Sequence, residues 1–285
     1  MKLSEILLAL AIVAGWGFNV AVGKMGVSEL NPLLFLSIRF FMAGIIFLPF
    51  AKVTRSQIKY LFLIAIFLNV GHMGGVFMAL RYLPASTMAV LQPLQVPLSI
   101  ILSYFILKED ITAKQIIGII VAFGGLLFMF GLPDLNLYGL IALAVGCLFW
   151  VLTQMLFKIS PKFDGYSFLA YTSLISSPFL FLFSYFGENV DYQNLDFGFS
   201  GRFYFSLAFQ VFAMSIAMLM WQRLVAKAGV NKTSPFTILS IVFGIIGGMI
   251  LFDESLNQNL IIGAVLVMIG VGLNVVSFPK RKNKL

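Results

Sequence analysis

The chain carries ten apolar segments, each close to the length that crosses a lipid bilayer, with short polar stretches between them. A helix needs about 20 mostly apolar residues to span a hydrocarbon core of roughly 30 Å. With 60% hydrophobic and 11% charged residues, the chain has too little polar surface for a soluble globule. The sequence therefore predicts an all-α integral membrane protein with ten transmembrane helices. The expected spans are residues 4–23, 32–50, 59–79, 85–107, 113–131, 137–157, 165–186, 203–225, 233–252 and 257–278.

The positive charges are divided unevenly between the two sets of loops. If the chain begins inside, fifteen of its 19 Lys and Arg residues fall on the inner side, and the outer loops hold only Lys24, Arg81 and Arg202. This positive-inside pattern predicts that both termini are cytoplasmic. It also accounts for the net charge of +8 without a nucleic-acid partner. The first apolar run is longer than the core of a signal peptide, so we expect it to be retained as a span.

Two stretches of the first half are nearly respelled in the second half. "WGFNVAVGK" at 16–24 resembles "WVLTQMLFK" at 150–158, with an offset of 134 positions. "LKEDITAKQIIGIIVAFGG" at 107–125 aligns without gaps to "FDESLNQNLIIGAVLVMIG" at 252–270, with an offset of 145. The second half therefore carries about eleven extra residues, for which the polar stretch 187–202 is the obvious place.

Each half holds five spans, an odd number, so the second half must enter the membrane from the opposite side. The charges agree, because Glu109 lies beside lysines in an inner loop, whereas its counterpart Glu254 lies in an outer loop without them. Lys24 and Lys158 end equivalent helices on opposite faces, where a long side chain can reach the membrane surface. The sequence predicts two inverted five-helix repeats, residues 1–131 and 132–285, the second ending in a basic tail. Secondary transporters are built from such repeats.

The chain resembles the EamA-type branch of the drug/metabolite transporter superfamily over essentially its whole length. The matching stretches are "WGFNVAVGK", "SIRFFMAG" at 37–44, "LKEDITAKQIIG" and "FDESLNQNLIIG". "AVLQPLQVPLSIIL" at 89–102 and "SPFTIL" at 234–239 are similar to the branch that exports cysteine-pathway metabolites. The resemblance implies export of an amino acid or related metabolite across a bacterial inner membrane. These motifs mark the family better than the substrate, so S-adenosylmethionine, nucleotides and drugs stay open.

Polar residues deep in a span either join helices or form a site, because lipid cannot satisfy them. Trp16 and Asn19 lie three apart and so share a face of the first span. Asn69 and His72 repeat that spacing in the third span, among glycines that allow close helix packing. We take all four as candidate substrate-binding residues, with interhelical hydrogen bonding as the alternative.

The fourth span contains the strongest local signal for a site. Gln92 and Gln95 are interleaved with Pro93 and Pro97, each of which frees the carbonyl four residues earlier. Broken backbone inside a membrane is tolerated where it is buried in protein or lines an aqueous cavity. The aligned positions of the ninth span hold no proline, so we expect the kink in one half only.

The second half supplies the other candidates, Trp150 and Gln154 in the sixth span, Tyr171 in the seventh, and Gln210 and Trp221 in the eighth. Gln210 and Trp221 lie eleven residues apart, about three turns, and so face the same way. Aromatic residues are also enriched at membrane interfaces as anchors, which is the alternative for Trp221.

Arg39 is the one charged residue expected deep inside a span, and such a guanidinium is costly unless it is paired. All eleven acidic residues fall in expected loops or at span ends. Its partner is then a set of backbone carbonyls or a carboxylate of the substrate, which Arg39 would bind in a bidentate manner.

A membrane enzyme is the rival class, but one His, one Cys and no buried carboxylate are too few for a nucleophile with a base or for a metal site. We therefore expect a secondary transporter that works by alternating access, and no enzyme, cofactor or metal. The expected partners are a small-molecule substrate and the lipid bilayer; the sequence leaves a homodimer open. His72 either carries a coupling proton or the carrier has no proton step of its own.

Overall fold

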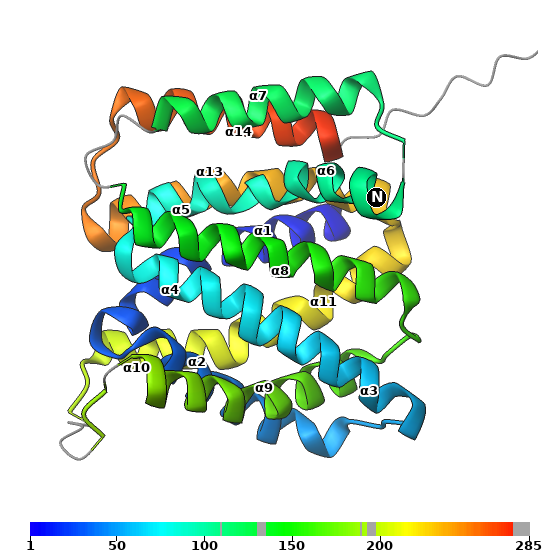
Figure 1. The fold of residues 1–285 in the computed structure, drawn as a ribbon, viewed down its shortest axis with the longest axis vertical. Helices are drawn as coiled ribbons and strands as arrows, with labels where there is room; N and C mark the ends of the chain where they lie inside the picture. Colours follow the sequence, from blue (N-terminus) through cyan, green and yellow to red (C-terminus); the bar gives the residue numbers. More distant parts are fainter. Residues whose placement is uncertain (109, 130–134, 189, 193–197, 276–285) are drawn as a thin grey trace, which may run out of the picture.

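Figure 1 shows the computed structural model, which describes residues 1–108, 110–129, 135–188, 190–192 and 198–275. Within these residues the chain forms ten helical spans, as predicted; nine have 18 residues or more, and α7 has 17. The spans are α1 (Leu3–Glu29); α2 (Pro32–Phe47) with η1 (Leu48–Phe50); α3 (Arg55–Ile64), η2 (Ala65–Met73) and α4 (Gly74–Tyr82); α5 (Ala85–Leu91), η3 (Gln92–Leu94) and α6 (Gln95–Leu107); α7 (Ala113–Met129); α8 (Leu137–Ile159); α9 (Gly165–Gly187); α10 (Gly201–Ala208), η4 (Phe209–Ala213) and α11 (Met214–Ala228); α12 (Val230–Thr233), η5 (Ser234–Ile238) and α13 (Leu239–Phe252); and α14 (Gln258–Val275).

Several helices of the second half begin at a side-chain cap. The Asn136 side chain accepts a hydrogen bond from the backbone N–H of Tyr138 at the start of α8. Asp164 accepts one from the N–H of Ser167 at the start of α9. Such caps satisfy N–H groups that have no partner within the helix, and they fix where each span leaves the polar loop before it.

Contacts between helix ends establish the inverted topology. At one end of the bundle, Glu254 after α13 accepts hydrogen bonds from the first residues of α5, and Lys24 near the end of α1 bonds Leu83 at the end of α4. At the other end, Gln57 at the start of α3 bonds the carbonyl of Lys162, between α8 and α9. We call these the Glu254 end and the Lys162 end. The first half thus begins at the Lys162 end and the second half at the Glu254 end, as predicted.

Equivalent helices of the two halves pair at the two edges of the molecule. α7 and α14 lie side by side at one edge, and α2 and α9 pack together at the opposite edge (Figure 1). Glycines bring α7 and α14 together, since a Cβ at Gly270 would lie 2.4 Å from the backbone nitrogen of Ala122. The remaining spans lie between these pairs, where the residues of the candidate site are found.

Irregular segments recur at equivalent places in the two halves. The third span of each half contains a π-helical segment, η2 and η4, and the fourth span of each contains a 3-10 segment, η3 and η5. Lys108 and Asp253, 145 positions apart, both end their helices in the left-handed conformation.

The expectation that only the first half is kinked was wrong. In the ninth span the 3-10 segment η5 directly precedes α13, and its Pro235 lies three residues before the aligned position of Pro93. Glu109, the boundary between the repeats at 131 and 132, and the basic tail from residue 276 lie outside the described residues, as does part of the stretch 187–202.

Candidate functional site

The eighth span presents Gln210 and Trp221 to α1, as their spacing predicts. The Gln210 side chain is fully buried in η4, and its Nε2 lies 3.5 Å from the carbonyl oxygen of Asn19, the long limit for a hydrogen bond. The rings of Trp16 and Trp221 meet edge to face with centroids 4.9 Å apart. Buried Oδ1 of Asn19 and Oε1 of Gln210 have no hydrogen-bond partner among the described residues. The tryptophan contact is apolar, and these two side-chain acceptors have no partner among the described residues.

The third span holds Asn69 and His72 in the π-helical segment η2, and both are bonded to other helices. Asn69 Nδ2 donates to Ser176 Oγ at 3.3 Å. His72 Nδ1 lies 2.9 Å from the carbonyl oxygen of Gly146, and because a carbonyl only accepts, this nitrogen carries a proton. The His72 ring also packs on Trp150, with centroids 5.0 Å apart. These contacts favour interhelical packing over direct substrate contact for the two residues.

The fourth span breaks where its prolines predict, at the 3-10 segment η3 (Gln92–Leu94). Gln92 and Gln95 are both half-buried, and Oε1 of Gln95 has no partner among the described residues. Ser99 donates to the carbonyl of Gln95 at 2.6 Å, which satisfies part of the backbone beyond the break. The kink thus leaves the Gln95 side chain with an unused acceptor.

Arg39 lies in α2 with its guanidinium against two aromatic rings. Its Cζ is 4.9 Å from the ring centroid of Phe40 and 5.8 Å from that of Phe77. Buried Nη1 has no hydrogen-bond partner among the described residues, whose carboxylates all lie in loops or in the first or last turn of a helix. Stacking on rings offsets part of the cost of burying the cation, but this donor is left without an acceptor.

Phe77 links the guanidinium to the amide of the eighth span. A Cβ placed on Gly23 would lie 3.1 Å from Gln210 Nε2 and 3.3 Å from Phe77 Cζ. Both side chains therefore occupy the space that Gly23 leaves open on α1. Arg39, Phe77, Gln210 and Asn19 form one neighbourhood, which we call the Arg39 cluster, built from four spans.

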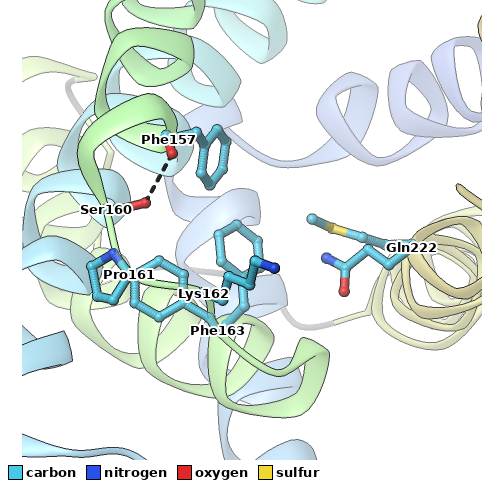
Figure 2. Close-up of a pocket in the computed structure, with 8 residues that line it drawn as sticks. Phe157, Ser160, Pro161, Lys162, Phe163 and Gln222 are labelled. Atoms are coloured by element: carbon cyan, nitrogen blue, oxygen red, sulfur yellow. Dashed lines mark hydrogen bonds between the residues drawn. The ribbon is translucent and has the colours of Figure 1, made fainter. Parts of the chain in front are cut away.

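A cavity of about 320 Å³ opens at the Lys162 end between α8, α9 and α11. Figure 2 shows Lys162 and Gln222 facing each other across it. Phe168 and Met218 of its wall also belong to the apolar cluster that contains Trp150 and Tyr171. The cavity thus reaches from the loop after α8 towards the aromatic candidates. Its lining residues are Phe157, Ser160, Pro161, Lys162, Phe163, Phe168, Met218 and Gln222.

The structure separates the remaining candidates and adds one. Tyr171 is half-buried, whereas Gln154 is exposed on α8, away from the buried groups. Asn274 of α14, which the sequence reasoning passed over, has both side-chain polar atoms buried without a partner among the described residues. Its Oδ1 lies against α7, 2.7 Å from where a Cβ on Gly118 would sit. An amide far along an apolar run, well beyond the polar residues that begin the span, was the signal that could have found it.

Known proteins match the chain over nearly its full length. The EamA-like transporter family matches residues 3–131 and again residues 137–276. The "Uncharacterized transporter YoaV" of Bacillus subtilis is 23% identical, over 94% of this chain and 95% of its own. A "Probable amino-acid metabolite efflux pump" of Salmonella typhimurium is 25% identical, over 99% and 98%. One solved structure has a TM-score of 0.62 at 18% identity and covers 96% of this chain and 98% of that one, which shows a shared fold.

Proposed function

This chain belongs to the EamA-like transporter family, and on that premise we propose that it is a secondary carrier that exports an amino acid or a related small metabolite by alternating access. Two relatives, from Salmonella typhimurium and Escherichia coli, are each named "Probable amino-acid metabolite efflux pump", at 25% and 23% identity. Inverted repeats of the kind seen here place a substrate site near the middle of the membrane, between the halves. The Arg39 cluster is built from spans of both halves, with Asn19, Arg39 and Phe77 in the first half and Gln210 in the second.

The observation that carries the proposal is the set of unused polar atoms in that cluster. Among the described residues, Arg39 Nη1 is a charged donor without an acceptor, and Asn19 Oδ1 and Gln210 Oε1 are acceptors without a donor. Leaving buried polar groups unpaired is costly, and a native structure keeps few of them. A zwitterion completes the set, because its carboxylate accepts from Arg39 while its ammonium donates to the amide oxygens.

The other candidates take supporting roles in this proposal. Trp150 and Tyr171 belong to the apolar cluster that borders the cavity at the Lys162 end, and Gln95 adds an acceptor at the kink of the fourth span. Asn69 and His72 hold the third span against α8 and α9. Of the candidate substrate-binding residues, Asn19, Arg39 and Gln210 then contact the substrate, and the exposed Gln154 takes no part.

For the location we propose a bacterial inner membrane with both termini in the cytoplasm. The excess of Lys and Arg in the loops of the Lys162 end supports this orientation, because positively charged loops stay on the cytoplasmic side. With this orientation the cavity at the Lys162 end opens to the cytoplasm, and we propose that this arrangement is the inward-open form from which an exporter loads.

A thermal-shift screen of the purified protein tests the substrate class. A ligand at a hundred times its Kd stabilises the state that it binds by about 2.7 kcal/mol. At about 2–4 °C per kcal/mol, we expect a shift of about 5–10 °C for at least one zwitterionic amino acid. The matching amine without the carboxylate should give none.

Two variants show whether the shift comes from the Arg39 cluster. Arg39→Gln should abolish the shift, whereas Arg81→Gln, which removes an exposed charge from α4, should retain it. A nucleoside or S-adenosylmethionine that stabilises the protein while every amino acid fails would replace the proposed substrate class. An undiminished shift in Arg39→Gln would remove Arg39 from the site.

A further inference from the structure

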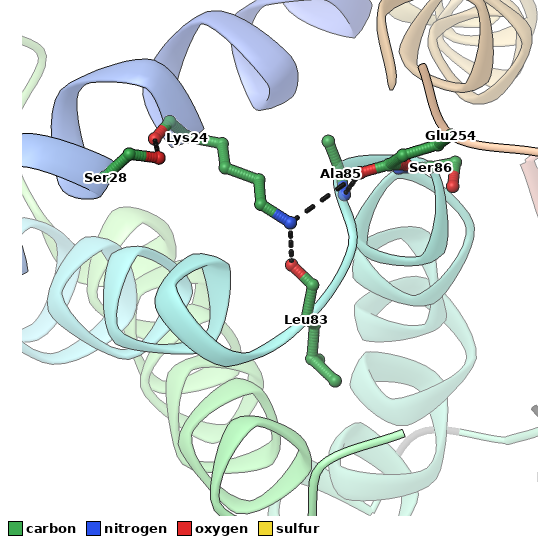
Figure 3. A network of polar contacts seen from close by, with 6 residues as sticks. All are labelled: Lys24, Ser28, Leu83, Ala85, Ser86 and Glu254. Carbon is green, nitrogen blue, oxygen red and sulfur yellow. Dashed lines mark hydrogen bonds and ion pairs between the residues drawn. The ribbon is translucent and has the colours of Figure 1, made fainter. Parts of the chain in front are cut away.

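Lys24 joins three spans at the Glu254 end. Its Nζ donates to the carbonyl oxygen of Leu83 at 2.8 Å and lies 3.6 Å from Glu254 Oε1 (Figure 3). The same ammonium lies 5.4 Å from the ring centroid of Phe252. The sequence interpretation of Lys24 as a membrane-surface anchor is therefore incomplete, because its side chain is 21% exposed and turned towards neighbouring helices.

Glu254 completes the junction through both oxygens of its carboxylate. Oε1 accepts from the backbone N–H of Ala85 at 2.7 Å, and Oε2 accepts from that of Ser86 at 2.8 Å. Gly248 permits this approach, since a Cβ there would lie 2.6 Å from Oε2. The loop after α13 is thus tied to the start of α5, while Lys24 ties α1 to both. Charge-assisted hydrogen bonds of this kind are roughly twice as strong as neutral ones.

The Lys162 end looks different at the equivalent place. The repeat relates the end of α1 to the end of α8, and the end of α4 to the end of α11. In the first half, Lys24 and Leu83 bridge the ends of α1 and α4. In the second half, the cavity separates Phe157 of α8 from Met218 and Gln222 of α11. At the Glu254 end the Lys24 and Glu254 contacts close the bundle, whereas at the Lys162 end a cavity lies between α8 and α11.

A second carboxylate at the Glu254 end provides a comparison. Glu188 accepts from the N–H groups of Leu33 and Leu34 at the start of α2 at 2.9 and 3.3 Å. It joins α2 to α9, and that pair stays in contact along its length down to the hydrogen bonds between Ser167 and Lys52 at the Lys162 end. By contrast, the contact of α1 with the third span lies in α4, near the Glu254 end. The Glu254 contacts therefore join spans outside the α2–α9 pair.

We propose that Lys24 and Glu254 form a latch that holds the Glu254 end shut in the inward-open form and must release before the carrier opens to the other side. This inference rests on alternating access in the proposed function. Removing either side chain removes contacts that exist only in the closed form, so the equilibrium shifts towards opening at the Glu254 end. A tenfold shift corresponds to about 1.4 kcal/mol.

Distances between spin labels measure the latch without any substrate. Labels at Arg81→Cys on α4 and Leu256→Cys in the loop after α13, both exposed positions, report across the Glu254 end in a Cys147→Ala background. Double electron–electron resonance should give one short distance for the otherwise unchanged chain. Glu254→Gln and Lys24→Met should each raise the long-distance fraction about tenfold.

Glu188→Gln is the matched control, because it weakens a carboxylate contact at the same end without touching the latch. Its distance distribution should stay that of the parent. Lys24→Met leaves the Glu254 hydrogen bonds to α5 in place, so it tests the latch even if Glu254→Gln does not fold. The proposal is overturned if a folded latch variant keeps the parent distribution, or if Glu188→Gln shifts it equally. The distance measurements need no substrate, so a failed substrate screen does not affect their outcome for the latch variants or for Glu188→Gln.

Discussion

Replacing Gln210 by methionine should make the protein more stable and less able to respond to substrate. Gln210 Oε1 is buried and has no partner in the part of the chain that the structure describes, and Nε2 lies 3.5 Å from the carbonyl oxygen of Asn19. Methionine fills a similar volume without polar atoms. A binding site commonly costs stability, because groups kept ready for a ligand are unsatisfied without it.

The expected gain follows from those contacts. A buried acceptor without a partner costs about 1–3 kcal/mol, whereas a typical intramolecular hydrogen bond contributes about 0.5–1.5 kcal/mol and this one is at the long limit. The net gain for Gln210→Met is then about 1–2 kcal/mol. At about 2–4 °C per kcal/mol, the melting temperature should rise by about 2–8 °C.

Thermal unfolding in detergent without ligand measures this gain, with Ser206→Ala as the control. Ser206 lies in the same span and also faces α1, but its hydroxyl is satisfied, donating to the carbonyl of Val22 at 2.6 Å. Ser206→Ala should therefore lower the melting temperature. If Gln210→Met lowers it as well, Gln210 is a packing residue and the reasoning about unused acceptors fails.

Three further results are expected. Gly75→Ala should destabilise the protein by about 1–3 kcal/mol, because its Cβ would lie 2.6 Å from a carbonyl oxygen of α8. Gly74→Ala should melt near the parent, because its Cβ would meet only side-chain atoms at 3.5 Å or more. Equal melting temperatures for the two variants would contradict the packing. His72→Gln should respond to a pH gradient in proteoliposomes as the parent does, since the His72 ring is 1% exposed and bonded to α8. If the variant loses gradient-driven accumulation but keeps downhill flux, His72 is a proton carrier. In intact cells, an impermeant thiol reagent should label a single cysteine at Asp191 and spare one at Lys52, and the reverse would overturn the orientation.

The spans and the inversion could be predicted because they depend on properties of the linear sequence. Segment length and hydropathy locate the ten helices, and the respelled stretch at 16–24 and 150–158 reveals the repeat. An odd number of spans in each half then determines the opposite orientation. Pro93 likewise predicts the break in the fourth span, because it lacks a backbone N–H.

The irregular segments of other spans depend on packing and were not predicted. The π-helical segment η2 carries no proline, and it packs against α8 and α9, where glycines allow close approach. The 3-10 segment η5 contains Pro235, but Pro93 aligns with Ile238, three residues further along the chain, so the repeat did not predict this segment. Such π-helical segments are frequent at functional sites, and here they hold Asn69, His72 and Gln210.

The candidate site could be predicted in its residue types and only partly in its pairings. The sequence indicated that Arg39 has no carboxylate partner in any span, and the structure leaves its Nη1 without an acceptor among the described residues. Lys24 could not be matched to Glu254, because these residues lie 230 positions apart and only the fold brings them together. Nor could the sequence separate Asn69, which is bonded to Ser176, from Asn19, whose Oδ1 is unused.

Counterflow in proteoliposomes tests the central claim most directly, that the chain carries a zwitterionic metabolite through the Arg39 cluster. Vesicles preloaded with the unlabelled amino acid that gives the largest thermal shift are diluted into a trace of the labelled compound. The parent protein should concentrate the label transiently without ATP or an ion gradient, and Arg39→Gln should not. Counterflow at the parent rate in Arg39→Gln would contradict the proposed site, and a parent protein that shows no counterflow for any zwitterion would contradict the proposed function.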